Sequence, residues 1–205
     1  MRIQGAMENE PLIDPEMKAE LSAIYRAPDR HYHDLSHIEA LLALALEYRT
    51  ALSDPDAVEA AIWFHDAIYD SRRSDNETRS ARLALEKLAG RTGAERLARI
   101  ARMIEATATH ALPDLGDKAA GRDAALFLDM DLSILGASPV EFDAYEAAVR
   151  REYGWVEEKA WRAGRAVVLE KFLARPHIFH TDVFKRRFEA KARKNLARSL
   201  AALAD

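Results

Sequence analysis

Helix start signals recur along this chain at short intervals, and they constrain its fold more than any other feature. Asp14, Asp54 and Ser138 each precede a proline. This order places a capping side-chain oxygen directly before a residue that is well tolerated at the first helical position. Apolar residues follow at helical spacing, without a convincing strand alternation. The pattern therefore predicts an all-α protein.

The same signals divide the chain into about nine helices, which we expect to form one helical bundle. The longest loop candidate is the Pro-, Gly- and Asp-rich stretch 110–122. We expect one all-α domain over residues 13–205, preceded by a flexible tail over residues 1–12. The helices are expected over residues 14–26, 34–52, 54–70, 75–90, 93–110, 123–136, 138–153, 155–175 and 181–203.

The composition narrows the class of protein. With 205 residues and 49% hydrophobic residues, the chain can bury a core. It has no cysteine, which excludes disulfides, a cysteine nucleophile and thiolate metal sites. No apolar run is long enough to span a bilayer, and the N-terminal stretch lacks the apolar segment of a signal peptide. We therefore expect a cytoplasmic protein.

The stretch AIWFHDAIYD, residues 61–70, places His65 beside Asp66 in an otherwise apolar part of the third predicted helix. Charged groups are rarely buried without a partner. A structural hydrogen-bonded pair and a pair of metal ligands both remain open at this point. An arginine could satisfy Asp66, and a backbone carbonyl could satisfy His65.

Further imidazoles and carboxylates lie on other predicted helices. Divalent metals accept these ligands where no thiolate is offered, and helical bundles build metal sites from them. Each of these imidazoles and carboxylates, taken singly, also has a plain structural explanation, as a surface histidine, a salt-bridge partner or a helix-end residue. They are His31, His33 and His37 at the start of the second predicted helix, His110 at the end of the fifth, and Asp129 and Asp131 in the apolar stretch ALFLDMDLSIL.

The order of these groups resembles that of the HD-domain superfamily, and especially its branch of predicted metal-dependent phosphohydrolases. The matching residues are His37, then His65 and Asp66, then Asp131. The stretches YHDLSHI, DNETRSA, ATATH and GRAVVLEKFLARPHIFHT add to a resemblance that covers most of the chain. It implies an HD-domain-like helical fold, a divalent metal held by those four residues and hydrolysis of a phosphate ester. Asp131 is preferred to Asp129 because it directly precedes LSILG, where the family pattern places its last aspartate.

Two further carboxylates are candidates for proton transfer. Asp70 lies four residues after Asp66, so on a continuous helix both would share one face. We expect Asp70 either to orient or deprotonate the attacking water, or simply to end the helix. Glu77 could act similarly from the next helix, although a glutamate in a first turn also stabilises the helix terminus.

A phosphate needs cationic or hydrogen-bonding partners, and arginine offers paired donors that match it. Arg30, directly before HYHDLSH, is the first candidate, and Arg150 in AVRREY is the next. His33 lies one turn before His37 and could share its face. His110 could contact phosphate or extend the site toward a second metal.

The expected activity is hydrolysis of a small phosphorylated molecule, such as a nucleotide, by a water that Mn, Mg, Co, Ni, Fe or Zn activates. A metal-containing nucleotide-binding or regulatory module without turnover is the alternative, and a structural helical adaptor is the third. We expect no membrane and no nucleic-acid partner, while a homodimer stays open. The basic stretch FKRRFEAKARKNLARSL is expected to pack through an apolar face, with its basic residues as the solvated back.

Overall fold

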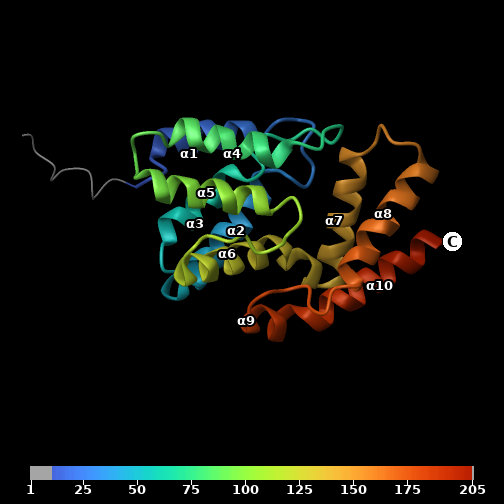
Figure 1. Cartoon of the computed structure of the whole chain (residues 1–205). Helices are drawn as coiled ribbons and strands as arrows, with labels where there is room; N and C mark the ends of the chain where they lie inside the picture. Colours follow the sequence, from blue (N-terminus) through green and yellow to red (C-terminus); the bar gives the residue numbers. More distant parts are fainter. Residues whose placement is uncertain (1–10, 205) are drawn as a thin grey trace, which may run out of the picture. The chain divides into compact units, whose positions relative to one another are not determined.

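The computed structural model describes residues 11–204, and all regular structure within this range is helical (Figure 1). The predicted all-α fold is confirmed, and the nine helices of ten or more residues agree with the predicted number. They are α1 (Pro15–Tyr25), α2 (Leu35–Glu47), α3 (Pro55–Phe64), α4 (Asn76–Lys87), α5 (Ala94–Ala106), α6 (Lys118–Asp131), α7 (Pro139–Glu152), α8 (Glu158–Leu173) and α10 (Ala190–Ala204).

Four shorter helical segments complete the described part of the chain. Two of them are 3-10 turns, η1 (Arg49–Ala51) and η2 (Leu132–Gly136). The other two, α9 (Asp182–Phe184) and the π-helical segment η3 (Lys185–Glu189), lead directly into α10. The predicted tail lies mostly outside the described residues, but Leu12, which the prediction includes in it, is buried.

The predicted helix caps are present where the sequence places them. Asp14 accepts a hydrogen bond of 2.8 Å from the backbone N–H of Met17, and Asp54 accepts one of 3.1 Å from that of Ala57. Ser138 and Glu141 form a reciprocal capping box at the start of α7. These bonds involve neighbours in sequence, which is why local patterns were sufficient to predict them.

The chain divides into two compact units. The single domain expected over residues 13–205 therefore spans both units. Unit 1 comprises Met1–Ala27 and His33–Phe127, and unit 2 comprises Pro28–Tyr32 and Leu128–Asp205. Helix α6 begins in unit 1 and ends in unit 2. Each unit is described below by itself.

Helix α3 is the centre of unit 1 and contacts α1, α2, α4 and α5 (Figure 1). Seven of its ten residues are buried, among them Ile62, Trp63 and Phe64. A helix that is apolar around most of its circumference is stable only inside a core. Asp123 of α6 joins this core by accepting hydrogen bonds of 2.8 Å from the backbone N–H groups of Ser53 and Asp54.

Helix α10 organises unit 2, where it packs against α8, η2 and η3. The side chain of Asn195 donates to the carbonyls of Leu135 and Ala137, which ties α10 to the end of η2. Gly136 lies so close to Phe188 that an added Cβ would stand 2.6 Å from the Phe188 Cβ atom. The close approach of these two segments therefore requires glycine at position 136.

Two helix boundaries differ from the prediction. Helix α3 ends at Phe64 rather than Asp70, because the following segment binds α4 instead of continuing the helix. Asn76 pairs with the backbone N–H and carbonyl of Asp70, and Ser80 does the same for Ile68. Helix α6 begins at Lys118, inside the predicted loop 110–122, where the carboxylate of Asp117 accepts from the backbone N–H of Ala120.

We predict opposite effects for alanine at two glycines of unit 2. Gly136→Ala should lower the free energy of unfolding by about 1–3 kcal/mol, because its Cβ meets both backbone and Cβ atoms of Phe188. Gly164→Ala is the control, since no atom lies within 4 Å of its Cβ position in α8. This change should be neutral or should stabilise the protein by up to about 1 kcal/mol. Urea unfolding measures both, and equal stabilities of the two variants would contradict the close approach at Gly136.

Candidate metal centre

His37 lies in the first turn of α2, and its position follows from the cap of that helix. The carboxylate of Asp34 accepts from the backbone N–H groups of Ser36 and His37, at 2.9 and 3.3 Å. The imidazole is on the buried side of α2, with 6% of the residue exposed. A local sequence signal, an aspartate three residues before the histidine, thus fixes the backbone that carries this side chain.

His65 follows the last residue of α3, so it is a C-cap rather than a residue within the helix as predicted. Its residue is only 1% exposed, and its Nδ1 atom lies 2.9 Å from the carbonyl oxygen of Ile62. A carbonyl only accepts, so Nδ1 carries the proton in this contact. When the ring is neutral, its lone pair is then on Nε2, which is the form in which histidine binds metals.

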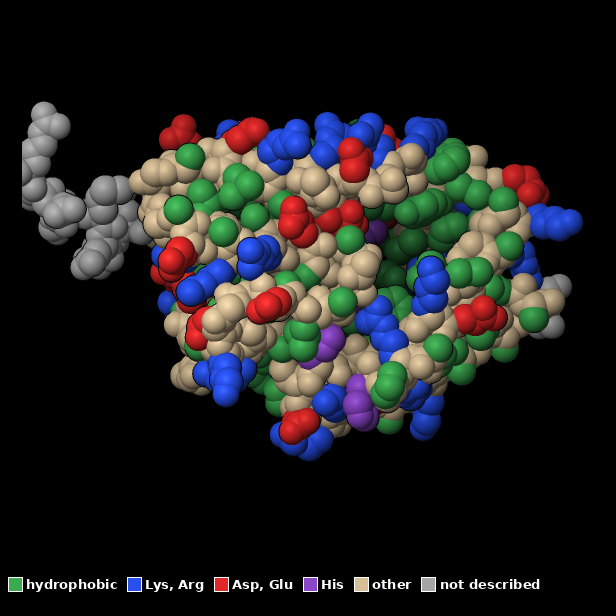
Figure 2. Space-filling model, in the orientation of Figure 1, with side chains coloured by type: hydrophobic (Ala, Val, Ile, Leu, Met, Phe, Trp, Pro, Cys, Tyr) green, Lys and Arg blue, Asp and Glu red, His purple; other side chains and the backbone are tan. Residues whose placement is uncertain are grey.

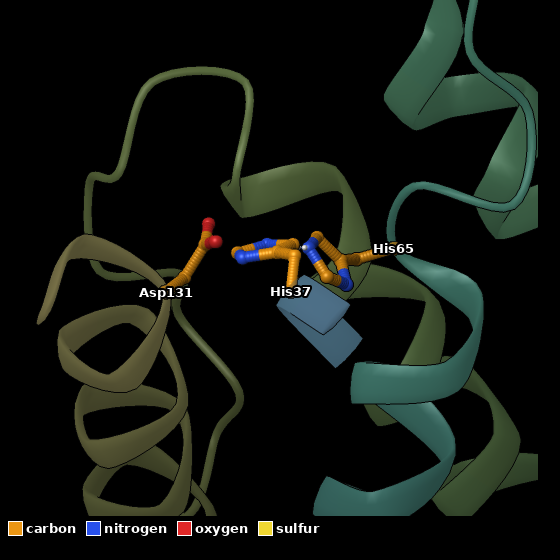
Figure 3. Close-up of side chains that lie close together, drawn as sticks. All are labelled: His37, His65 and Asp131. Carbon is orange, nitrogen blue, oxygen red and sulfur yellow. Dashed lines mark hydrogen bonds between the residues drawn. The ribbon is translucent and has the colours of Figure 1, made fainter. Parts of the chain in front are cut away.

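The two imidazoles face each other through these nitrogens. The Nε2 atoms of His37 and His65 lie 3.3 Å apart, as the dashed line in Figure 3 marks. Metal–nitrogen bonds of about 2.0–2.1 Å, meeting at an angle between a right angle and a tetrahedral one, separate two ligand nitrogens by about this distance. The spacing therefore fits both a direct hydrogen bond and two ligands of one ion.

Asp66 adds a carboxylate directly beside both histidines. Its Oδ2 atom lies 3.0 Å from Nε2 of His65 and 3.8 Å from Nε2 of His37. Burial disfavours the charged form, but the histidines at positions 65, 33 and 37 outweigh this and hold the pKa of Asp66 well below its usual range. The side chain is thus an anion in the company of imidazoles, which is the ionisation state of a metal ligand.

Asp131 enters the site as the last residue of α6. Phe127, one turn earlier on this helix, places its ring edge-on to His65, with centroids 5.8 Å apart. Residues four apart share a helical face, so Asp131 follows Phe127 toward the histidines. His37, His65 and Asp131 each offer one ligand atom, and these atoms lie within 4.8 Å of one another (Figure 3). This group could hold a metal ion.

Asp129, the other aspartate of this stretch, forms structural hydrogen bonds with the loop before α9. Its oxygens accept hydrogen bonds from the backbone N–H of His180 at 2.6 Å, and from the N–H and hydroxyl of Thr181 at 2.7 and 2.6 Å. Burial raises the pKa of Asp129 although these donors oppose the shift. Asp129 therefore holds the loop before α9, and the group of potential ligands contains Asp131 instead.

An aromatic pair flanks the histidines, and sequence reasoning found only half of it. The ring of His33 stacks on that of Tyr69, with centroids 4.2 Å apart and planes 26° apart, and lies 6.3 Å from the ring of His37. Both residues are partly exposed. Tyr69 was not predicted, because only the turn after α3 brings it back beside His33.

Of the two carboxylates expected to transfer protons, Asp70 lies in a turn rather than on the predicted helix, whereas Glu77 lies where it was predicted. Asp70 does not share a helical face with Asp66, because α3 has already ended. Its carboxylate accepts a hydrogen bond of 2.9 Å from the backbone N–H of Arg72 and thus stabilises a turn. Glu77 is in the first turn of α4, as expected, where its charge favours the helix N-terminus.

Among the expected phosphate contacts, Arg150 is committed to structure. Its guanidinium donates to the carbonyls of Tyr153 and Val156, pairs with Glu158 at 3.0 Å and lies over the ring of Trp161. It thereby closes the connection between α7 and α8. These bonds use the donors that a phosphate would require.

Arg30 and His110 lie in irregular segments. Arg30 is half-buried in the segment before His33. The two residues that follow it, His31 and Tyr32, donate their backbone N–H groups to the carboxylate of Glu152. His110 ends the turn after α5 with φ of 52°, a left-handed conformation that is uncommon for residues other than glycine.

Comparison of this chain with family models, with curated proteins and with solved structures finds no match. Within residues 11–204, no helix has the length and apolar character needed to cross a membrane.

We predict that His65→Ala abolishes binding of a divalent ion. Loss of one ligand should weaken binding more than about 100-fold, since even residues that only orient ligands contribute about 10–100-fold. An ion at 100 times its dissociation constant stabilises the wild type by about 2.7 kcal/mol, which a thermal-shift titration with Mn²⁺, Ni²⁺ or Zn²⁺ detects. His177→Ala is the matched control, because His177 is exposed and does not belong to the group that could hold the ion. A full thermal shift in the His65 variant would contradict the assignment.

Proposed function

We propose that this chain is a metal-dependent phosphohydrolase of the HD-domain type. The observation that supports it most directly is the 3.3 Å approach of two buried Nε2 atoms beside an ionised carboxylate. With both imidazoles in the neutral form that binds a metal, the proposed ligands including Asp66 and Asp131 would carry a formal charge of −2. A divalent cation would balance this charge.

The ligand set that we propose is His37, His65, Asp66 and Asp131. The nitrogen and oxygen donors suit Mn, Mg, Co, Ni, Fe or Zn, of which the imidazoles favour the transition metals. Such an ion supplies water activation near neutral pH and neutralises charge on phosphoryl oxygens. The chain itself contributes the tautomer of His65, fixed by the Ile62 carbonyl, and the anionic state of Asp66.

The substrate class that we propose is a small phosphorylated molecule, such as a nucleotide. His33 lies beside the ligands on a partly exposed ring stack with Tyr69, so its imidazole is suited to donate a hydrogen bond to a phosphoryl oxygen. Arg30 is three residues earlier and remains the first arginine candidate for the same anion. Arg150 leaves the proposal because its donors are engaged elsewhere.

The proposed activity predicts metal-dependent turnover of a generic substrate. Wild-type protein stripped with a chelator should be inactive toward an aryl phosphate and toward nucleotides, and Mn²⁺, Co²⁺ or Ni²⁺ should restore hydrolysis. Asp66→Asn should lower kcat at least about 100-fold, because it removes one charge and one donor from the ion's surroundings. His177→Ala should keep full activity. Metal and nucleotide binding without turnover over a broad phosphate panel would instead indicate a regulatory module.

The role of Arg30 gives a separate prediction. Arg30→Ala should raise KM roughly ten-fold or more with metal affinity unchanged, because one charge-assisted hydrogen bond to the substrate phosphate is lost. Arg26→Ala is the control, an exposed arginine four residues earlier. Steady-state kinetics on the reconstituted protein measures the effect. Unchanged KM and kcat in the Arg30 variant would remove it from the site.

A further inference from the structure

The C-terminal part of unit 2 concentrates positive charge. Residues 171–198 contain nine lysines and arginines but only two acidic residues, a formal charge of +7. The whole chain carries −4, so the remaining residues carry −11. This separation of charge along the chain requires a physical explanation that the proposed metal centre does not supply.

Packing forces the basic residues of α10 outward. Ala192, Asn195 and Leu196 are buried on the side that meets α8 and η2. Lys191, Lys194 and Arg198 recur at intervals of three and four residues, so they share another face of the helix, and all three are exposed. The amphipathic helix expected from sequence is therefore present, and the charged side chains of its exposed face are basic, with Arg198 paired to Asp143 of α7.

The acidic residues of the segment are used within the fold. The carboxylate of Glu189 accepts from the backbone N–H groups of Ile178 and Phe179 and pairs with Arg193 at 2.8 Å. Asp182 lies 3.5 Å from Lys185. These contacts neutralise both acids with two of the basic residues. The other seven have no acidic partner within the segment, although Arg198 pairs with Asp143 of α7 at 2.7 Å. We call these seven the basic surface: Lys171, Arg175, Arg186, Arg187, Lys191, Lys194 and Arg198.

Arg193 connects α10 to the end of α8 and the loop that follows it, the two segments that carry the basic surface. Its guanidinium donates to the carbonyls of Leu173, Arg175 and Pro176, which fixes the end of α8 and the following loop against α10. The backbone of Arg175 therefore lies next to α10. Figure 2 shows Lys, Arg and His side chains together over α9 and the first turns of α10.

Two guanidinium groups of the surface are held by aromatic rings. That of Arg175 lies 4.6 Å above the ring centre of Phe172, and that of Arg187 lies 4.9 Å above that of Phe188. A stacked guanidinium keeps its charge and its edge donors while losing side-chain freedom before any ligand arrives. This preorganisation reduces the entropic cost of binding an anion.

We propose that the basic surface binds the sugar–phosphate backbone of a nucleic acid, without reading its bases. From Lys191 to Arg198 the helix rises about 10 Å, which spans about three phosphates of one strand along a duplex axis. An anionic membrane fits less well, since interfacial helices insert large apolar side chains. The exposed large apolar residues described for unit 2 are Val140, Trp155, Val167 and Val168, all outside residues 171–198. This proposal replaces our expectation of no nucleic-acid partner and is independent of the phosphohydrolase activity.

The test uses the full chain and fluorescein-labelled duplexes of 20 base pairs, one of DNA and one of RNA, in fluorescence anisotropy. The wild type should bind at low salt, and its log Kd should depend steeply on log salt concentration. The triple variant Arg186→Gln, Lys191→Gln, Lys194→Gln should bind at least ten-fold more weakly. Its salt slope should fall by about 2–3, because each lost phosphate contact removes about 0.9 from the slope.

The control is a triple variant with the same change in net charge on another helix, Arg79→Gln, Arg82→Gln, Lys87→Gln on α4, whose three residues are exposed. It should bind like the wild type. Equal losses in both variants, or no binding of either duplex at 50 mM salt, would overturn the proposal. So would binding to vesicles that contain phosphatidylserine with no binding to the duplexes. Metal-induced thermal shifts in both variants verify that each remains folded.

Discussion

The hydrogen bond between His65 Nδ1 and the Ile62 carbonyl is the contact on which the candidate site depends. Carbonyls in the last turn of a helix have no partner within the helix and must be satisfied otherwise. At the end of α3 the side chain of His65 supplies the donor. The same bond fixes the tautomer, so that the ring satisfies the helix end with one nitrogen and offers the other to the site.

The burial of α3 explains why the bond between His65 and the Ile62 carbonyl matters for the electrostatics of the site. Because nearly the whole helix is inside unit 1, its C-terminus delivers His65 and Asp66 to a position where water screens little charge. An imidazole and a carboxylate in such surroundings attract strongly, as the lowered pKa of Asp66 reflects. With one proton of His65 held at Nδ1, the 3.0 Å contact between its Nε2 atom and Asp66 Oδ2 needs a positive charge at these atoms, either a second proton on the imidazole or a metal ion. A shared cation supplies this charge, which is the physical case for a metal there.

Much of the fold could be predicted from sequence because helix starts are local. Asp14, Asp54 and Ser138 cap residues two to four positions away, and such signals survive without tertiary context. Helix ends were harder. Apolar residues continue past Phe64 and mimic a longer helix, while Asn76 and Ser80, which end it, lie on the next helix. The misplaced role of Asp70 follows from that single boundary.

The residues alone predict the candidate site only up to the choice among carboxylates, because what distinguishes them is long-range; the preference for Asp131 came from the family resemblance. Four buried or half-buried carboxylates each accept hydrogen bonds from two consecutive backbone N–H groups of a distant segment. They are Asp123 with Ser53 and Asp54, Asp129 with His180 and Thr181, Glu152 with His31 and Tyr32, and Glu189 with Ile178 and Phe179. Two amide donors satisfy a buried anion without any ion.

Asp66 belongs to a different class. The contacts described for its carboxylate are with the imidazoles of His65 and His37, at 3.0 and 3.8 Å, and not with backbone N–H groups. Sequence shows the same residue type, the same apolar flanks and the same helical context for Asp129 as for Asp131. Only the fold shows that Asp129 is satisfied by the backbone and that Asp131 belongs to the group, with His37 and His65, that could hold a metal ion. A structural carboxylate and a candidate metal ligand therefore differ in their neighbours: backbone N–H groups in the first case and imidazoles in the second. These neighbours come from distant segments, so only the folded chain shows them.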